Sequence, residues 1–170
     1  MSKIELYLGD ITKLGCDCIV NAANKTLSGG GGVDGAIHRA AGYKLLEECK
    51  TLNGCNTGEA KITKGYNLKA KYVIHTVGPI YSGKEQDAVL LSACYKNSLD
   101  LAKQNEIKSI AFPAISTGVY AYPIDEATAI AVKTVKEWIK NNSDYDITVI
   151  FCCFDDATYI PYKKQLESKI

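Results

Sequence analysis

The sequence predicts an α/β sandwich built around a largely parallel or mixed sheet. Short apolar runs alternate with amphipathic stretches along the chain, which is the pattern of strands connected by helices. The run Ile147–Phe154 is almost continuously apolar, as is typical of a strand that is covered on both faces. Two glycine-bearing loops also stand between an apolar run and a helical stretch. These observations favour helices packed against a buried sheet.

Six stretches are candidates for strands. They are Ile4–Leu8, Cys18–Asn21, Lys61–Gly65, Tyr72–Val77, Ser109–Pro113 and Ile147–Phe154. In α/β sheets of this kind, ligands bind beyond the carboxyl ends of the strands. We therefore expect the residues that follow these runs to meet in one crevice.

Four helices are expected after the first loop. They are Gly35–Cys49, Asp87–Asn105, Pro123–Asn141 and a final helix that starts near Asp155 and Asp156. The third stretch carries apolar residues at spacings of three and four, and Pro123 suits its first turn. Acidic residues such as Asp155 and Asp156 favour a helix N-terminus. Strands and helices thus alternate along most of the chain.

Length and charge limit the classes of partner. The 170 residues contain no linker, repeat or low-complexity segment, so we expect one domain that spans residues 1–170. The formal net charge is +1, and no global field attracts nucleic acid or an anionic membrane. No apolar stretch approaches the ~18–20 residues of a membrane span. We expect a monomer that binds neither membranes nor nucleic acid.

The seven cysteines indicate a reducing compartment. Their number is odd, their spacing is irregular, and no secretion signal precedes them. We therefore expect reduced thiols and a cytoplasmic protein. Cys16 and Cys18 have the spacing of half a metal site, but no partner pair follows at the spacing of a zinc site. We interpret the cysteines as small buried apolar residues.

The two loops have the features of an anion-binding site. The first contains Gly29–Gly35 and the second contains Ser116–Tyr120, and each leads into a predicted helix. Glycine lets the backbone approach a ligand, and a helix N-terminus directs unpaired N–H groups at an anion. Arg39 is the only arginine, so backbone amides must hold most of any phosphate. Two such loops suggest a diphosphate that is held from both sides.

Two other glycine motifs match less well. Gly30, Gly32 and Gly35 satisfy the dinucleotide-binding spacing, but eight residues separate the preceding strand from the first of them. The stretch Gly78–Lys84 is close to a P-loop, but Glu85 stands where Ser or Thr would bind Mg²⁺. The dinucleotide spacing keeps a nicotinamide-dependent dehydrogenase as an alternative.

Three polar residues near the loops each have two interpretations. Asp10 either caps a turn or accepts a hydrogen bond from an exocyclic amine, which would select adenine over guanine. Asn24 either closes an Asx-turn or binds a ribose hydroxyl and orients a water. Asp34 either caps the helix that follows or acts beside the phosphates as a general base or as a group that orients a water. A carboxylate in an anion-binding loop repels the ligand, which favours the catalytic interpretation of Asp34.

Aromatic and histidine residues near the loops also have competing roles. Phe154 either joins the core or stacks on a base, an interaction typically worth about 1–3 kcal/mol. Tyr120 is placed to close over a ribose. His38 and His75 are interpreted as hydrogen-bonded structural residues. No thiol has a predictable base partner, so a cysteine nucleophile is unsupported.

Several of these motifs together resemble a known family. The motifs are Gly9–Thr12, Val20–Asn24, Gly29–Gly42, His75–Pro79, Phe112–Pro123 and Phe154. The chain resembles the macrodomains, and specifically the MacroD-type ADP-ribosyl hydrolases, along nearly its whole length. That resemblance implies a three-layer α/β/α fold that binds ADP-ribose.

The resemblance also implies a role for each site residue. Asp10 would hold adenine, Ile11 would line its pocket, and Phe154 would stack on the base. Asn24 would contact the distal ribose, and Asp34 falls on the catalytic aspartate of the family. The diphosphate would be cradled by Gly31, Gly32 and Val33 on one side and by Ser116, Thr117, Gly118, Val119 and Tyr120 on the other.

By resemblance, the reaction is hydrolysis of esters on the distal ribose. The substrates would be O-acetyl-ADP-ribose and proteins that carry mono-ADP-ribose on Asp or Glu side chains. No cofactor or metal is expected, because the zinc-dependent subclass uses Cys and His near the catalytic loop and residues 29–34 contain neither. A non-catalytic reader of ADP-ribose is the main alternative. Ala121 and Phe154 depart from the glycine and tyrosine that relatives often carry at these positions.

Overall fold

The computed structural model describes residues 1–167, so the last three residues of the expected domain lie outside the described part. Its strands are β1 (Lys3–Leu8), β2 (Cys18–Ala22), β3 (Ala60–Lys64), β4 (Tyr72–Thr76), β5 (Ser109–Phe112) and β6 (Thr148–Cys153). Its helices are α1 (Gly32–Ala41), α2 (Tyr43–Lys50), α3 (Glu85–Gln104), α4 (Ile124–Asn141), α5 (Asp156–Glu167) and the short 3₁₀ helix η1 (Ile11–Lys13). All six strand candidates expected from the sequence form strands, with ends that differ by at most one residue.

The strands form a six-stranded sheet in the order β1-β6-β5-β2-β4-β3. Each neighbouring pair from β1 to β4 is parallel, and β3 is antiparallel to β4. The expectation of a mixed, largely parallel sheet is confirmed. Because five strands run in the same direction, their carboxyl ends lie along one edge of the sheet.

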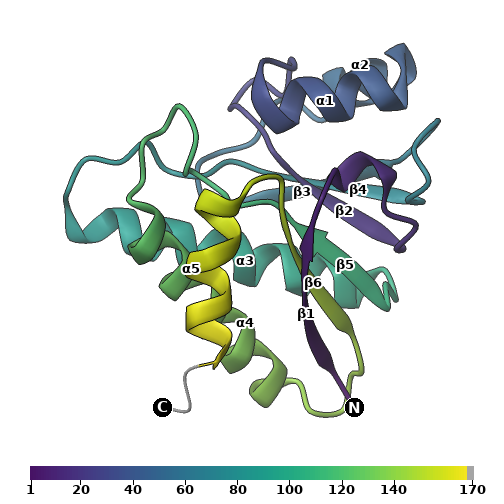
Figure 1. Cartoon of the computed structure of the whole chain (residues 1–170). Helices are drawn as coiled ribbons and strands as arrows, with labels where there is room; N and C mark the ends of the chain where they lie inside the picture. The colour runs from purple at the N-terminus through teal and green to yellow at the C-terminus, as the bar shows by residue number, and fades with distance from the viewer. Residues whose placement is uncertain (168–170) are drawn as a thin grey trace.

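Helices cover both faces of this sheet (Figure 1). Helices α1 and α2 pack on one face, where Ile37 and Leu45 join a cluster with Ile19 and Val73 of the strands. Helices α3, α4 and α5 pack on the other face. The structure is therefore a three-layer α/β/α sandwich, as expected.

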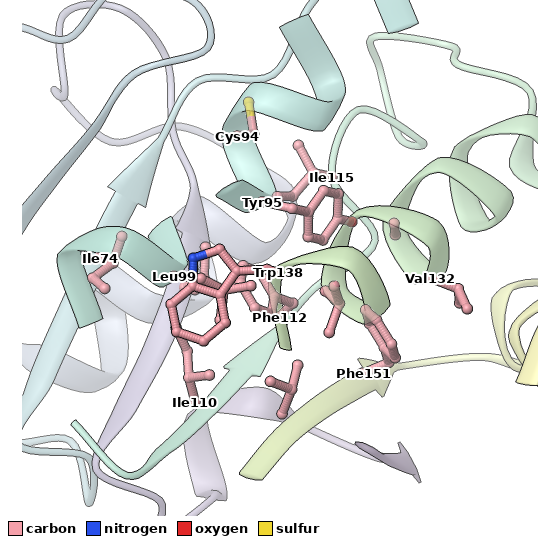
Figure 2. Packing of buried hydrophobic residues seen from close by; sticks show 14 of the residues in the cluster. Ile74, Cys94, Tyr95, Leu99, Ile110, Phe112, Ile115, Val132, Trp138 and Phe151 are labelled. Atoms are coloured by element: carbon pink, nitrogen blue, oxygen red, sulfur yellow. The ribbon is translucent and has the colours of Figure 1, made fainter. Parts of the chain in front are cut away.

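Alternation along the strands divides the core into two clusters. In β5, Phe112 faces helices α3 and α4, whereas Ala111 faces the layer that contains α1 and α2. Figure 2 shows Phe112 among large side chains of the larger cluster, and its ring lies 4.9 Å from that of Tyr95. Period-two burial on both faces explains why the strands are almost continuously apolar.

The sequence predicted one helix over Gly35–Cys49, and this prediction was wrong in its extent. Two helices occupy this region, α1 and α2, and they are separated by Gly42. Gly42 has φ of 90°, a left-handed conformation that ends α1 and that glycine adopts without steric cost. The apolar spacing continues across the break, which is why the sequence pattern predicts one helix.

Within residues 1–167, none of the helices combines the length and the apolar character needed to cross a bilayer.

Removal of a large core side chain should test this packing. Phe112 is fully buried, so Phe112→Ala should lower the free energy of unfolding by about 3–5 kcal/mol through lost burial and a residual cavity. Val89→Ala, at a side chain on α3 that is 60% exposed, is the control and should change it by less than ~0.5 kcal/mol. Urea denaturation monitored by circular dichroism measures both. Equal effects of the two substitutions would contradict this description of the core.

Candidate functional site

The candidate site lies at the edge where the five parallel strands end. Asp10 follows β1, Asn24 follows β2, Ser116 follows β5 and Phe154 follows β6. The order of strands places β6 and β5 between β1 and β2, so these residues line one continuous edge. The topology places these residues along one edge of the sheet, and the crevice in which the sequence predicts that they meet stays a prediction.

The first loop connects β2 to α1 and is closed by Asn24. Its side-chain Nδ2 donates to the Gly29 carbonyl at 2.9 Å, and its Oδ1 accepts from the Ser28 backbone N–H at 3.2 Å. Thr26 Oγ1 donates to the same Oδ1 at 3.1 Å. Asn24 thus performs the loop-closing role that the sequence left open, and one N–H of its amide remains for another acceptor.

The start of α1 lies close against this loop. A Cβ at Gly35 would overlap the Gly30 carbonyl, so only glycine permits the observed approach. Helix α1 begins at Gly32, and its first intrahelical bond runs from the Gly35 N–H to the Gly31 carbonyl at 3.2 Å. The N–H groups of Gly32 and Val33 belong to the first turn, where no intrahelical acceptor exists. The loop therefore presents backbone donors at the positive end of a helix.

The second loop connects β5 to α4 and is a compact turn. The Tyr122 N–H donates to the Ser116 carbonyl, and the Ala121 N–H donates to the Gly118 carbonyl, both at 2.9 Å. The Tyr81 N–H, from the segment after β4, donates to the Tyr120 carbonyl at 2.9 Å. These bonds hold the loop in shape from within and from one side.

Individual residues of the second loop differ in exposure. Val119 is 98% exposed and Gly118 is exposed, whereas Ser116 and its hydroxyl are buried. Ser116 has φ of 68° and Ala121 has φ of 60°, so two non-glycine residues hold left-handed conformations. Thr117 Oγ1 donates to the Ala114 carbonyl at 2.8 Å. The exposed residues Gly118 and Val119 are therefore flanked by residues that have strained backbone conformations and several hydrogen bonds.

Asp34 is buried in the first turn of α1 and is not its N-cap. The N-cap is Gly31, which makes no side-chain capping bond. Asp34 Oδ1 accepts from Asn21 Nδ2 at 2.8 Å and lies 3.4 Å from His38 Nε2. The capping interpretation of Asp34 is therefore wrong, and its carboxylate reaches into the protein instead.

The other oxygen of Asp34 faces the first loop. A Cβ built on Gly30 would lie 3.3 Å from Asp34 Oδ2 and 3.8 Å from Asn24 Nδ2. The two residues expected to be catalytic from the sequence thus flank the same point of the loop. A carboxylate oxygen and an amide N–H that lie near one point of a loop can bind a small polar ligand or a water there.

A buried polar chain behind Asp34 was missed by the sequence analysis. Asn21 on β2 and His75 on β4 are paired in register, and Asn21 Nδ2 lies 3.2 Å from His75 Nδ1. His75 Nε2 lies 2.9 Å from Thr63 Oγ1 on β3. His75 agrees with its interpretation as a hydrogen-bonded structural residue, but no role was assigned to Asn21 or Thr63. The available signal was that Asn21 and His75 interrupt apolar runs, whereas Thr63 lies beside Lys64 and gave no such signal.

The far end of the edge holds Asp10 and Phe154. Asp10 is the N-cap of η1, and its Oδ1 accepts from the Thr12 N–H at 2.9 Å and from the Thr12 hydroxyl at 2.7 Å. The hydrogen bond from the Thr12 hydroxyl is the largest of the effects that lower the pKa of Asp10. Its Oδ2 takes part in neither bond. Ile11 is buried, whereas Phe154 is 83% exposed, which excludes the core interpretation of Phe154.

Burial of His75 should make stability depend on pH. Burial, and secondly the nearby His38, lower the pKa of His75 to about 3, whereas an unfolded imidazole has a pKa near 6.5. Between these values the unfolded chain binds the extra proton, so the free energy of unfolding should fall as pH falls from 6.5. The slope should approach ~1.4 kcal/mol per pH unit, and His75→Asn should flatten it. Urea denaturation between pH 7 and pH 5 measures both, and equal slopes in the two proteins would contradict the buried neutral imidazole.

Comparison with known proteins gives a family. The profile of the family described as Macro domain matches residues 20–131, more than half of the chain. A macro domain-containing protein of Mesorhizobium japonicum is 60% identical over 159 residues, which cover 93% of this chain and 90% of that protein. The human ADP-ribose glycohydrolase MACROD2 is 56% identical over 169 residues, which cover 96% of this chain but 39% of the human protein.

Solved structures of macrodomains also superpose well on this chain. The Trypanosoma brucei macrodomain in complex with ADP-ribose superposes with a TM-score of 0.91 at 47% identity, over 96% of this chain and 68% of that chain. The Oceanobacillus iheyensis macrodomain with ADP gives a TM-score of 0.91 at 44% identity, over 96% and 90% of the two chains. The motifs, the sheet order and these likenesses lead to one conclusion: the chain belongs to the Macro domain family.

Proposed function

We propose that this protein binds ADP-ribose and hydrolyses ester bonds on its distal ribose. The substrates are O-acetyl-ADP-ribose and proteins that carry mono-ADP-ribose on Asp or Glu side chains. Relatives named ADP-ribose glycohydrolase are 52–56% identical to the chain over the 166–169 residues that align, and a related macrodomain is known in complex with ADP-ribose. The observation that supports catalysis most is the Asp34 carboxylate, which lies beneath the first loop with Oδ2 directed toward it.

In this proposal, backbone amides bind the diphosphate from two sides. Gly31, Gly32 and Val33 supply donors at the start of α1, where the helix dipole also favours an anion. Ser116, Thr117, Gly118, Val119 and Tyr120 form the opposite side. The internal bonds of the second loop support this role, because they fix its shape before a ligand arrives.

The adenine group occupies the β1 and β6 end of the edge. Asp10 Oδ2 accepts a hydrogen bond from the exocyclic amine, Ile11 lines the pocket, and Phe154 stacks on the ring. The Gly9 N–H donates to the Cys153 carbonyl at 2.8 Å, which keeps the residues after these two strands close together. The high exposure of Phe154 supports a role in stacking on a ligand.

The chemistry is water attack on the acyl carbon of the ester. Asn24 orients the distal ribose with the amide N–H that the loop does not use, and Asp34 Oδ2 positions the water and takes its proton. Collapse of the tetrahedral intermediate expels the ribose oxygen, which takes the proton back from Asp34 as it leaves. The products are ADP-ribose and the free carboxylic acid.

We further propose that the protein works in the cytoplasm as a monomer and without a metal ion. All seven cysteines are unpaired thiols, which supports a reducing compartment. The first loop offers a carboxylate and backbone amides rather than thiol or imidazole ligands, which supports hydrolysis by the chain's own residues. The net charge of +1 supports a small anionic ligand over nucleic acid as the partner.

Loss of the Asp34 carboxylate should separate catalysis from binding. Asp34→Ala should lower kcat on O-acetyl-ADP-ribose by ~100-fold or more, because no group is left to position the water. ADP-ribose should still bind in calorimetry, since backbone amides hold the diphosphate. Glu47→Ala, at an exposed acid of α2, is the control and should change neither quantity.

Three outcomes would contradict the proposed function. Unchanged turnover by the Asp34→Ala protein would exclude Asp34 from the reaction. An intact ester after incubation with the unmodified protein, together with tight ADP-ribose binding, would identify a reader module instead. Preference for NAD over ADP-ribose would favour the dehydrogenase alternative.

Stacking on adenine gives a second test. Phe154→Ala should weaken ADP-ribose binding by about 5- to 150-fold, since stacking of a base is worth about 1–3 kcal/mol. Because Phe154 is 83% exposed, the melting temperature should stay the same. Phe154→Tyr should retain the affinity, and Ile160→Ala, at another exposed apolar side chain, is the control. Equal affinity of the alanine variant and the unmodified protein would exclude the stacking role.

A further inference from the structure

The hydrogen bonds of the buried polar chain behind Asp34 can be donated in only one consistent direction. Asn21 Nδ2 lies 2.8 Å from Asp34 Oδ1 and 3.2 Å from His75 Nδ1, so one amide group contacts both neighbours. A carboxylate accepts hydrogen bonds and does not donate them, so the group that faces Asp34 must be the NH₂ of Asn21. Its second N–H then points to His75 Nδ1, which must be an unprotonated acceptor.

The proton of the His75 imidazole is therefore on Nε2. His75 is fully buried and stays neutral, because burial lowers its pKa to about 3. Nε2–H donates to Thr63 Oγ1 at 2.9 Å, and the Thr63 hydroxyl in turn donates to the Lys64 carbonyl at 3.1 Å. Cys49 Sγ, at 3.8 Å from Nε2, is the weaker of the two neighbours on that side. Thr63 thus supplies the acceptor for the Nε2–H of the tautomer that the Asn21 amide requires.

The observed orientation of the Asn21 side-chain amide leaves one of its polar atoms without a hydrogen bond, so other residues must stabilise it. Asn21 Oδ1 is buried and has no hydrogen-bond partner among the described residues. A flipped amide would bring this oxygen against the Asp34 carboxylate, which would repel it. The acceptor at His75 Nδ1 therefore helps to keep the amide in the observed orientation, since it bonds the NH₂ group and has nothing to offer an oxygen.

We propose that His75 and Thr63 are positioning residues for the reaction assigned to Asp34. They fix the Asn21 amide, and this amide holds Asp34 Oδ1 inside the protein so that Oδ2 faces the first loop. Neither residue touches the substrate. The proposal rests on the proposed function for its kinetic consequence, whereas the tautomer of His75 can be observed without any reaction.

The kinetic test uses a matched pair at Thr63. Thr63→Val keeps the shape of the side chain but removes the acceptor for Nε2–H, which favours the Nδ1–H tautomer and a flipped Asn21 amide. Its kcat on O-acetyl-ADP-ribose should fall by about tenfold, the effect of one lost hydrogen bond on the reacting group, with KM and ADP-ribose affinity unchanged. Thr63→Ser retains the hydroxyl and should restore kcat. Equal kcat in Thr63→Val and the unmodified protein would overturn the proposal.

The spectroscopic test observes the tautomer directly. The chain has two histidines, so ¹H–¹⁵N correlation spectra of the imidazoles contain two spin systems, and His75→Asn identifies that of His75. At pH 7 the unmodified protein and Thr63→Ser should show the neutral Nε2–H form, and Thr63→Val should shift it toward Nδ1–H. A neutral Nδ1–H form in the unmodified protein would overturn the proposal. Absence of ester hydrolysis with the expected tautomer would instead contradict the proposed function alone.

Discussion

The candidate site depends on how one buried carboxylate is held. Asp34 is 6% exposed, and a carboxylate removed from water needs donors that replace its hydration. The first turn of α1 provides a favourable dipole, and Asn21 provides a side-chain donor from the central strand β2. The same bond ties helix α1 to the sheet. The hydrogen bond between Asn21 and Asp34 therefore both positions the reactive carboxylate and attaches the start of α1 to the sheet. The first loop cannot move far without breaking this bond.

Much of the fold could be predicted because its signals are local. Runs such as Ile147–Phe154 are apolar on both faces, and the stripe along Pro123–Asn141 has helical spacing, so periodicity alone identifies them. The two loops were recognisable for the same reason, since glycines and helix starts are adjacent in sequence. Asp10 and Phe154 could be named from the ends of two strands. Their contacts with a ligand remain predictions.

What could not be predicted depends on pairing between distant segments. Asn21, His75 and Thr63 meet because β2, β4 and β3 are neighbours in the sheet with a particular register, and inspection of one sequence does not reveal which distant strands pair or in which register. The break at Gly42 was missed because apolar spacing continues through it, and the left-handed conformation shows only in the backbone. Asn24 was correctly placed in the loop, but its bond to Gly29 required the folded geometry.

The left-handed conformations of Ser116 and Ala121 have a consequence for binding. An L-residue in this region costs roughly 1–2 kcal/mol, and that cost is met by folding of the domain rather than by arrival of a ligand. The second loop is therefore pre-organised, and association need not be accompanied by a large loss of loop entropy. A ligand that fits the second loop binds without a change in the loop conformation. A ligand that requires another loop conformation binds more weakly, because the backbone resists the change.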